Sequence, residues 1–226
     1  MPLIVARGLT RIYSMGSSQV VGVREVDLEV EAGDFVVLKG DSGSGKTTLL
    51  SLLGGLDRPT RGELRVAGHD LHQADPARLT RYRRHVVGMV FQSFNLLPTL
   101  SVLENVCLPA LLAGSPYSST RREAAKLLHQ FGLEHRLDHW PSQLSGGEMQ
   151  RAAIARSLVN NPAILLADEP TGNLDSRNGR MVVDLLARLN REESRTVVMA
   201  THSHLADHCA TLQVLLEDGA RIDGRE

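Results

Sequence analysis

The chain has 226 residues, 42% of them hydrophobic, which is enough for one domain with a sizeable core but too few for two large domains. Its 25 basic and 26 acidic residues leave a formal net charge of −1, so the basic excess typical of nucleic-acid-binding proteins is missing and no nucleic-acid partner is expected. The two cysteines, Cys107 and Cys209, lie far apart, which argues against a disulfide framework or a cysteine-based metal site and suits the reducing cytosol.

The first elements along the chain are predicted to be strands. Residues 25–30 alternate acidic and hydrophobic side chains, a pattern typical of a half-buried antiparallel strand. Three short apolar runs, at residues 35–38, 164–167 and 197–200, are bounded by polar or turn residues. Continuous runs of this kind are typical of parallel strands that are covered on both faces by helices.

Helices are predicted in the middle of the chain. Residues 101–161 show helical spacing of hydrophobic side chains, so we expect a helical insertion at about residues 93–160 of a single domain spanning residues 1–226. Residues 214–222 predict a hairpin through an Asp-Gly turn. No apolar run approaches the roughly 20 residues that span a bilayer, and the first residues lack the plan of a signal peptide. The chain is therefore not expected to cross a membrane by itself.

A glycine-rich segment directly follows the apolar run at residues 35–38 and has the form Gly-x-x-x-x-Gly-Lys-Thr. Between a buried strand and a helix, this motif is a phosphate-binding loop, because its backbone N–H groups and the helix N-terminus face the phosphates. Lys46 is expected to reach the β- and γ-phosphates, and Thr47 to place its hydroxyl on Mg²⁺. The residues expected to contact the nucleoside triphosphate here are Gly40, Asp41, Ser42, Gly43, Ser44, Gly45, Lys46, Thr47 and Thr48.

Two acidic residues end the apolar run at residues 164–167. Open α/β sheets bind ligands at the carboxyl edge of their strands, so Asp168 and Glu169 are expected at the nucleotide. We expect Asp168 to hold Mg²⁺, directly or through water, and Glu169 to polarise the water that attacks the γ-phosphate.

A second helix start with small residues occurs at Ser145, Gly146 and Gly147, before a helical run. This helix start offers a second surface that can bind phosphate. One triphosphate in one chain has little use for two such surfaces, so we expect this one to face the nucleotide of a second copy of the chain.

With Leu144-Ser145-Gly146-Gly147 as a signature, nearly the whole chain resembles the ATP-binding subunits of ABC transporters. The resemblance implies an α/β fold: a P-loop NTPase core with a mostly parallel sheet, an antiparallel β subdomain and a helical insertion subdomain. It also implies site residues: Tyr13 stacking on adenine with Val20 at its edge, Gln92 at the Mg²⁺ shell, Asp175 in the loop after Asp168 and Glu169, and His202 at the γ-phosphate.

The resemblance further implies a mechanism and partners. Mg-ATP would close two subunits head to tail, with residues 40–48 of one and residues 145–147 of the other at each nucleotide. Glu169, His202, Lys46 and Gln92 would be the catalytic residues, and Thr47, Gln92 and Asp168 would hold Mg²⁺. The chain would sit peripherally on the cytoplasmic face of the inner membrane, touching the membrane through a transmembrane permease.

Longer motifs narrow the resemblance. Residues 90–98, 103–106 and 168–176 resemble the branch of lipoprotein-releasing, macrolide-exporting and cell-division ATPases. That branch favours export, lipoprotein extraction or mechanical transmission. A mechanical regulator of an extracytoplasmic enzyme is the alternative, because it uses the same motor. A soluble ABC protein is disfavoured, since such proteins commonly carry two nucleotide domains or a long coiled coil.

Two other patterns have ordinary explanations. His202, His204 and His208 do not fit one helix face, and no cysteine or acid completes a metal site with them. A basic run could face lipid headgroups but is more typical of a solvated helix; it comprises Arg78, Arg81, Arg83 and Arg84.

Overall fold

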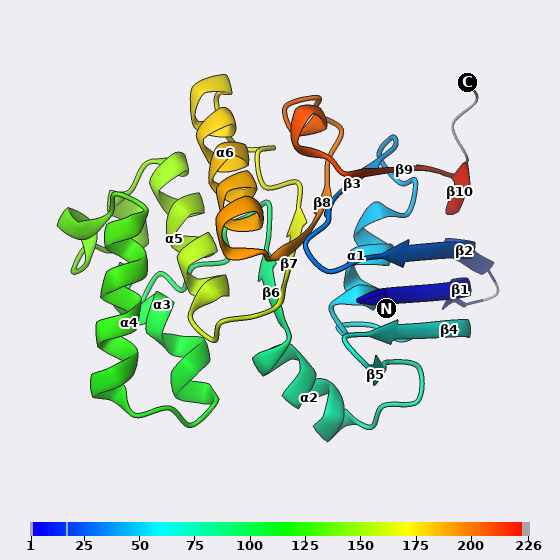
Figure 1. Ribbon diagram of the computed structural model, residues 1–226, viewed down its shortest axis with the longest axis horizontal. Coiled ribbons are helices and arrows are strands. Elements are labelled where there is room, and N and C mark those ends of the chain that lie inside the picture. The colour runs from blue at the N-terminus through cyan, green and yellow to red at the C-terminus, as the bar shows by residue number, and fades with distance from the viewer. Residues whose placement is uncertain (1, 17, 223–226) are drawn as a thin grey trace.

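The computed structural model describes residues 2–16 and 18–222 and contains a six-stranded sheet and a four-stranded sheet (Figure 1). The larger sheet has the order β10-β9-β3-β8-β7-β6, in which every pair is parallel except β9 with β10. Its strands are β3 (Phe35–Lys39), β6 (Val87–Val90), β7 (Ile164–Asp168), β8 (Thr196–Ala200), β9 (Leu212–Glu217) and β10 (Ala220–Ile222). The three predicted parallel strands and the predicted hairpin are thereby confirmed.

The parallel strands divide the hydrophobic core in two. On β7, Leu165 and Ala167 point into a core formed with α5 and α6, whereas Ile164 and Leu166 point into a core formed with α1 and the smaller sheet. The alternation repeats on β3 and β8. Both faces of the central strands are therefore covered, which explains why their sequences are continuously apolar.

The smaller sheet is antiparallel and has the order β2-β1-β4-β5. It consists of β1 (Ile4–Met15), β2 (Ser18–Val30), β4 (Arg61–Val66) and β5 (His69–Asp70). The predicted strand at residues 25–30 is the end of β2, with Val26, Leu28 and Val30 buried and the acidic residues exposed. The buried face packs on helix α1 (Lys46–Leu53), which begins at the phosphate-binding loop.

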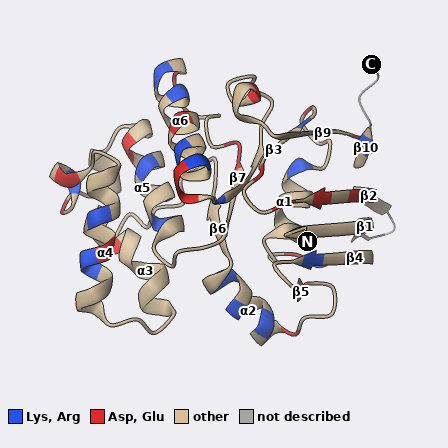
Figure 2. Cartoon of the chain, in the orientation of Figure 1, with Lys and Arg blue, Asp and Glu red and all other residues tan. Residues whose placement is uncertain are grey.

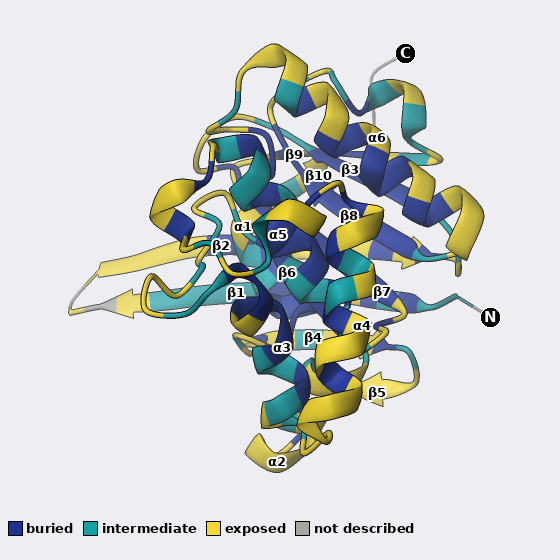
Figure 3. Ribbon diagram, turned by 90° about the vertical axis from the view of Figure 1, so that its left-hand side faces the viewer, coloured by how far each residue is buried: buried dark blue, intermediate teal, exposed yellow. Residues whose placement is uncertain are grey.

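The remaining helices are α2 (Pro76–His85), α3 (Val102–Leu112), α4 (Tyr117–Gln130), α5 (Gly146–Leu158) and α6 (Ser176–Glu193). Short 3-10 turns occur at Glu134–Arg136, Pro141–Gln143 and Asp207–Cys209. Helices α3 to α5 occupy the predicted helical stretch, and the outer faces of α4 and α6 are exposed (Figure 3). Within residues 2–16 and 18–222, no helix is long and apolar enough to span a bilayer.

Helix α2 carries the basic run. Arg78, Arg81 and Arg84 are exposed, as expected of a solvated helix face, while Arg83 is half-buried and donates to the carbonyl of Gly55 at 2.8 Å. Elsewhere the two signs of charge are interspersed, as along α6 (Figure 2).

Asn105 on α3 organises the loop that leads away from β6. Its side chain is fully buried; Oδ1 accepts from the backbone N–H of Leu97 at 2.7 Å, and Nδ2 lies 3.0 Å from the carbonyl oxygens of Leu97, Leu100 and Ser101. Ser101 and Glu104 close a capping box at the start of the same helix. One amide therefore satisfies the backbone of a loop that has no regular secondary structure.

We predict that Asn105→Ala lowers the free energy of unfolding by about 3 kcal/mol, because several buried backbone groups lose their partner. Urea denaturation measures this as a lower midpoint at an unchanged slope. The control is Gln130→Ala, which truncates an exposed amide at the end of α4. An equal midpoint for Asn105→Ala and the control would show that the Asn105 amide does not stabilise the loop.

Candidate functional site

The phosphate-binding loop adopts a left-handed backbone that favours glycine at several positions. Gly40 and Gly45 have φ angles of +142° and +102°. A Cβ on Gly40 would lie 2.2 Å from the carbonyl oxygen of Leu216. Helix α1 starts directly after its N-cap residue Gly45, which has no side chain to accept from the first N–H groups. This leaves the positive end of the helix dipole available to a phosphate, as the motif predicts.

Lys46 is held by the loop that it follows. Its side chain is buried, and Nζ donates to the carbonyl oxygens of Gly40 and Asp41, both at 2.8 Å. The two contacts fix the ammonium over the loop and account for two of its three protons. An anion in the loop would therefore meet a positive charge that is already oriented.

Thr47 and Asp168 meet across the sheet edge. The Thr47 hydroxyl donates to Oδ1 of Asp168 at 3.1 Å, although the two residues are 121 positions apart. Burial raises the pKa of Asp168 and so outweighs the opposing effects of Thr47 and Lys46, while the neighbouring Glu169 adds to the rise. A hydroxyl and a carboxylate held together are hard oxygen donors, and this donor set fits Mg²⁺.

Glu169 adopts a left-handed backbone conformation with φ +44°, which is rare for a residue with a side chain. Its N–H donates to the carbonyl of Ala200 at 2.9 Å, so the turn is tied to β8. Oε1 accepts from the backbone N–H of His202, and Nδ1 of His202 lies 3.1 Å from the same oxygen. Oε2 is buried and has no hydrogen-bond partner within the described part of the chain.

Gln92 lies beside the segment that follows Glu169. A Cβ on Gly172 would be 2.6 Å from Nε2 of Gln92. The backbone carbonyl of Gln92 accepts from Nδ2 of Asn173 at 3.0 Å. The side chain is exposed. Of the residues predicted from sequence, Thr47 thus meets Asp168 and Glu169 meets His202, while Gln92 lies against Gly172.

Ser145 caps helix α5 together with Glu148. The Ser145 Oγ accepts from the N–H of Glu148, and Oε2 of Glu148 accepts from both the N–H and the Oγ of Ser145 at 2.8 Å. Arg136 Nε donates to the other Glu148 oxygen at 2.9 Å. The hydrogen bond from the Ser145 backbone, together with those from its side chain and from Arg136, lowers the pKa of Glu148 to about 2 despite burial.

Gly146 and Gly147 let the loop after Glu169 approach α5. A Cβ on Gly147 would lie 2.3 Å from Oδ1 of Asn178, and one on Gly146 would lie 3.3 Å from Leu174. Asp175 caps α6 by accepting from the Asn178 N–H at 2.8 Å, which lowers its pKa. Helix α5 packs on the opposite face of the six-stranded sheet from α1. The two glycine-led helix starts therefore belong to different faces.

Tyr13 and Val20 are paired on β1 and β2. The Tyr13 hydroxyl donates to Oδ2 of Asp57 at 2.8 Å, and Arg11 Nε donates to the same oxygen at 2.8 Å. The Arg11 guanidinium lies 4.5 Å from the centroid of the Tyr13 ring, a cation–π contact. Sequence patterns did not predict Arg11 or Asp57, because an isolated aspartate in a loop gives no sign of its partner.

Three glycines join the sheets to the phosphate-binding loop. A Cβ on Gly45 would lie 2.4 Å from the carbonyl oxygen of Gly22, and one on Gly22 would lie 2.8 Å from both Tyr13 and Thr48. Gly219, in the β9–β10 turn, donates to the Ser44 carbonyl at 3.1 Å. The aromatic of β1 and the start of α1 are thereby held at a fixed separation.

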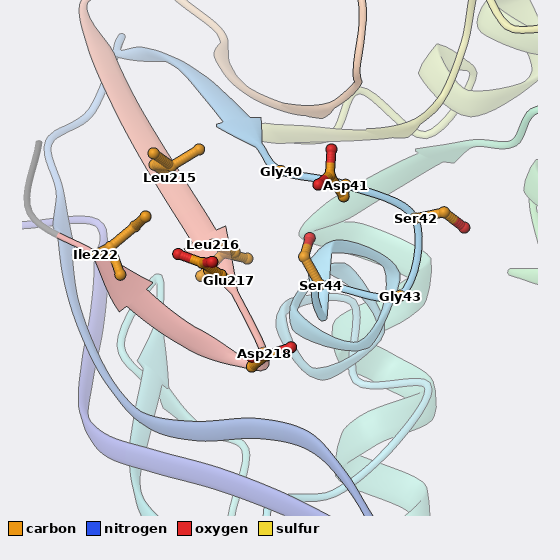
Figure 4. Close-up of a pocket in the computed structure, with 10 residues that line it drawn as sticks. All are labelled: Gly40, Asp41, Ser42, Gly43, Ser44, Leu215, Leu216, Glu217, Asp218 and Ile222. Atoms are coloured by element: carbon orange, nitrogen blue, oxygen red, sulfur yellow. The ribbon is translucent and has the colours of Figure 1, made fainter.

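A cavity of about 400 Å³ lies between the phosphate-binding loop and the strands β9 and β10 (Figure 4). It is lined by Gly40, Asp41, Ser42, Gly43, Ser44, Leu215, Leu216, Glu217, Asp218 and Ile222. Neither Lys46 nor Thr47 lines it, and its charged side chains are all acidic. The acidic side chains disfavour an anionic phosphate in this cavity.

Comparison with known proteins assigns the chain to a protein family. The family model described as ABC transporter matches residues 23–172. The chain belongs to the ABC transporter family. An uncharacterized ABC transporter ATP-binding protein of Thermotoga maritima is 46% identical over 216 residues, covering 96% of this chain and 92% of that protein. Macrolide export ATP-binding/permease protein MacB of Syntrophobacter fumaroxidans is 47% identical over 97% of the chain, which spans only 31% of that relative.

Solved ABC structures have the same fold. The ATP-binding cassette MJ0796, as a dimer in a post-hydrolysis state bound to ADP and Pi, matches with a TM-score of 0.91 and 39% identity, covering 99% of this chain and 98% of that one. A second dimeric structure of MJ0796 matches with a TM-score of 0.90 and 41% identity over 97% of each chain. The predicted fold class is confirmed, as is the predicted class of enzyme, an ABC-type ATPase. The roles of individual residues stay predictions.

We predict that Tyr13→Ala in this ABC protein weakens ATP binding about fivefold, because an aromatic stack contributes roughly 1 kcal/mol. Tyr13→Phe keeps the ring and is expected to keep most of the affinity. Equilibrium binding of ATP and of inorganic triphosphate measures the difference, with triphosphate as the ligand that has no base. Equal losses for both ligands would contradict stacking on adenine.

Proposed function

We propose that the chain is the ATP-hydrolysing subunit of an ABC transporter and binds Mg-ATP along the phosphate-binding loop. The observation that carries this is the meeting of Thr47 with Asp168 and of Glu169 with His202 at one sheet edge, beside Lys46. Residues 40–48 would hold the phosphates. Tyr13, with its strand partner Val20 at its edge, would hold adenine, since Tyr13 lies next to Thr48 across Gly22.

Hydrolysis places one water oxygen on the γ-phosphorus while the bond from that phosphorus to the bridging oxygen breaks, giving ADP and phosphate. Glu169 orients this water and accepts its proton, a role for which its unpartnered Oε2 is suited. Lys46 and His202 stabilise charge on the γ-phosphate oxygens. Thr47, Asp168 and Gln92 would hold Mg²⁺, whose positive charge would offset the negative charge of the phosphates.

The chain works as a head-to-tail dimer in this proposal. Ser145, Gly146 and Gly147 begin α5, on the opposite sheet face from α1, which favours their use on the nucleotide of a second copy. Asp175 caps α6 by accepting from the N–H of Asn178, whose side chain lies against Gly147. The MJ0796 cassettes, which share this fold, are dimeric.

We predict that Glu169→Gln keeps ATP binding but stalls hydrolysis and accumulates the ATP-bound dimer, because proton acceptance is lost while the phosphate contacts remain. Size-exclusion chromatography with Mg-ATP, with bound nucleotide quantified in each peak, measures this. The matched control, Glu123→Gln, neutralises an exposed carboxylate on α4 and should behave as the unaltered protein. Elution as a monomer with ATP bound would contradict the cross-subunit arrangement.

The partner is a transmembrane permease, through which the chain meets the cytoplasmic face of the inner membrane. The MacB relative is named as a combined ATP-binding and permease protein, and this chain matches about a third of it. Export, lipoprotein extraction or mechanotransmission would be the work of the assembly.

We expect tagged Glu169→Gln, solubilised from membranes with detergent and Mg-ATP, to retain a permease with a large extracytoplasmic domain. Mass spectrometry identifies the retained protein, and tagged Lys46→Ala, which should not trap the ATP-bound state, is the control. Recovery of ribosomes or of soluble proteins alone would contradict the membrane assignment and favour a soluble ABC protein.

A further inference from the structure

Lys39 makes a contact that the nucleotide chemistry above does not use. It ends β3 directly before Gly40, and its side chain is only 14% exposed. Nζ lies 2.5 Å from Oδ1 of Asp207 and donates to the carbonyl of Ser203 at 2.5 Å. The phosphate-binding strand is thus tied to the segment that follows β8, which carries His202.

The segment at residues 201–207 is anchored on both sides of His202. Before it, the N–H of Thr201 donates to the carbonyl of Leu38 at 3.1 Å. After it, Ser203 and Asp207 are the partners of Lys39. The His202 side chain itself is 70% exposed, and Glu169 is the hydrogen-bond partner that the described residues give it.

Asp207 is built to remain a carboxylate. Nδ1 of His204 lies 2.8 Å from its second oxygen, opposite the contact with Lys39. Burial raises the pKa of Asp207, but the contacts with Lys39 and His204 outweigh burial and hold the pKa below its usual range. The negative charge offsets that of Lys39, so Lys39 is not a second phosphate-binding lysine beside Lys46.

We infer that Lys39 and Asp207 are positioning residues that set the place of His202 at the γ-phosphate. The contacts of Lys39 hold the end of β3 and the segment at residues 201–207 together. His202 therefore stays at a fixed distance from a phosphate in the phosphate-binding loop. A misplaced histidine would slow hydrolysis and leave nucleotide binding intact. The inference rests on the proposed role of His202, and the test below separates the two.

The test is a double-mutant cycle on ATP hydrolysis by the full chain. Lys39→Met is expected to lower kcat about tenfold while KM for ATP changes less than about twofold. Lys39→Arg keeps the charge and should recover much of the rate. In a His202→Ala background, Lys39→Met should cause no further loss, because its effect passes through His202. Asp207→Asn should repeat the pattern if Lys39→Met folds poorly.

Four outcomes would overturn the inference. An unchanged kcat for Lys39→Met, with the kcat of His202→Ala clearly lowered, rejects the positioning role alone. An equal loss from Lys39→Met with and without His202 shows a general structural effect, and a large rise in KM shows a phosphate contact. Full activity of His202→Ala would reject the proposed role of His202 itself.

Discussion

The register of three adjacent parallel strands is the constraint on which the site depends. Strands β3, β8 and β7 are paired in that order, so their carboxyl ends come to one edge. The phosphate-binding loop follows the first, His202 follows the second, and Asp168 ends the third. Alternate side chains of each strand lie in two separate cores. A shift of one strand's register by one residue would move its side chains into the opposite cores and would displace the site residues that follow the strand.

Much of this arrangement follows from sequence because the relevant signals are local. Continuous apolar runs predict buried parallel strands, and the residues after each run must then share an edge. For this reason the meeting of Thr47 with Asp168 could be expected, although 121 positions separate them. The Gly-x-x-x-x-Gly-Lys-Thr motif adds the chemistry, since its residue types serve phosphate and Mg²⁺.

Side-chain contacts between distant surface segments could not be predicted in the same way. Asp57 binds Tyr13 and Arg11, and Asp207 binds Lys39, but an isolated aspartate in a loop gives no sign of its partner. Strands β4 and β5 were also missed, because they are short and mostly exposed. Weak periodicity leaves such elements to be decided by packing.

The glycine contact between β2 and the phosphate-binding loop has a consequence for nucleotide selection. A Cβ on Gly22 would clash with Tyr13 and Thr48, and a Cβ on Gly45 would clash with the carbonyl oxygen of Gly22. No side chain therefore fits at either position. The separation between the aromatic ring and the start of α1 is thus set by bare backbone, which cannot stretch or repack as side chains do. In the proposed site, this fixed separation selects a ligand whose base and phosphates lie one nucleotide length apart.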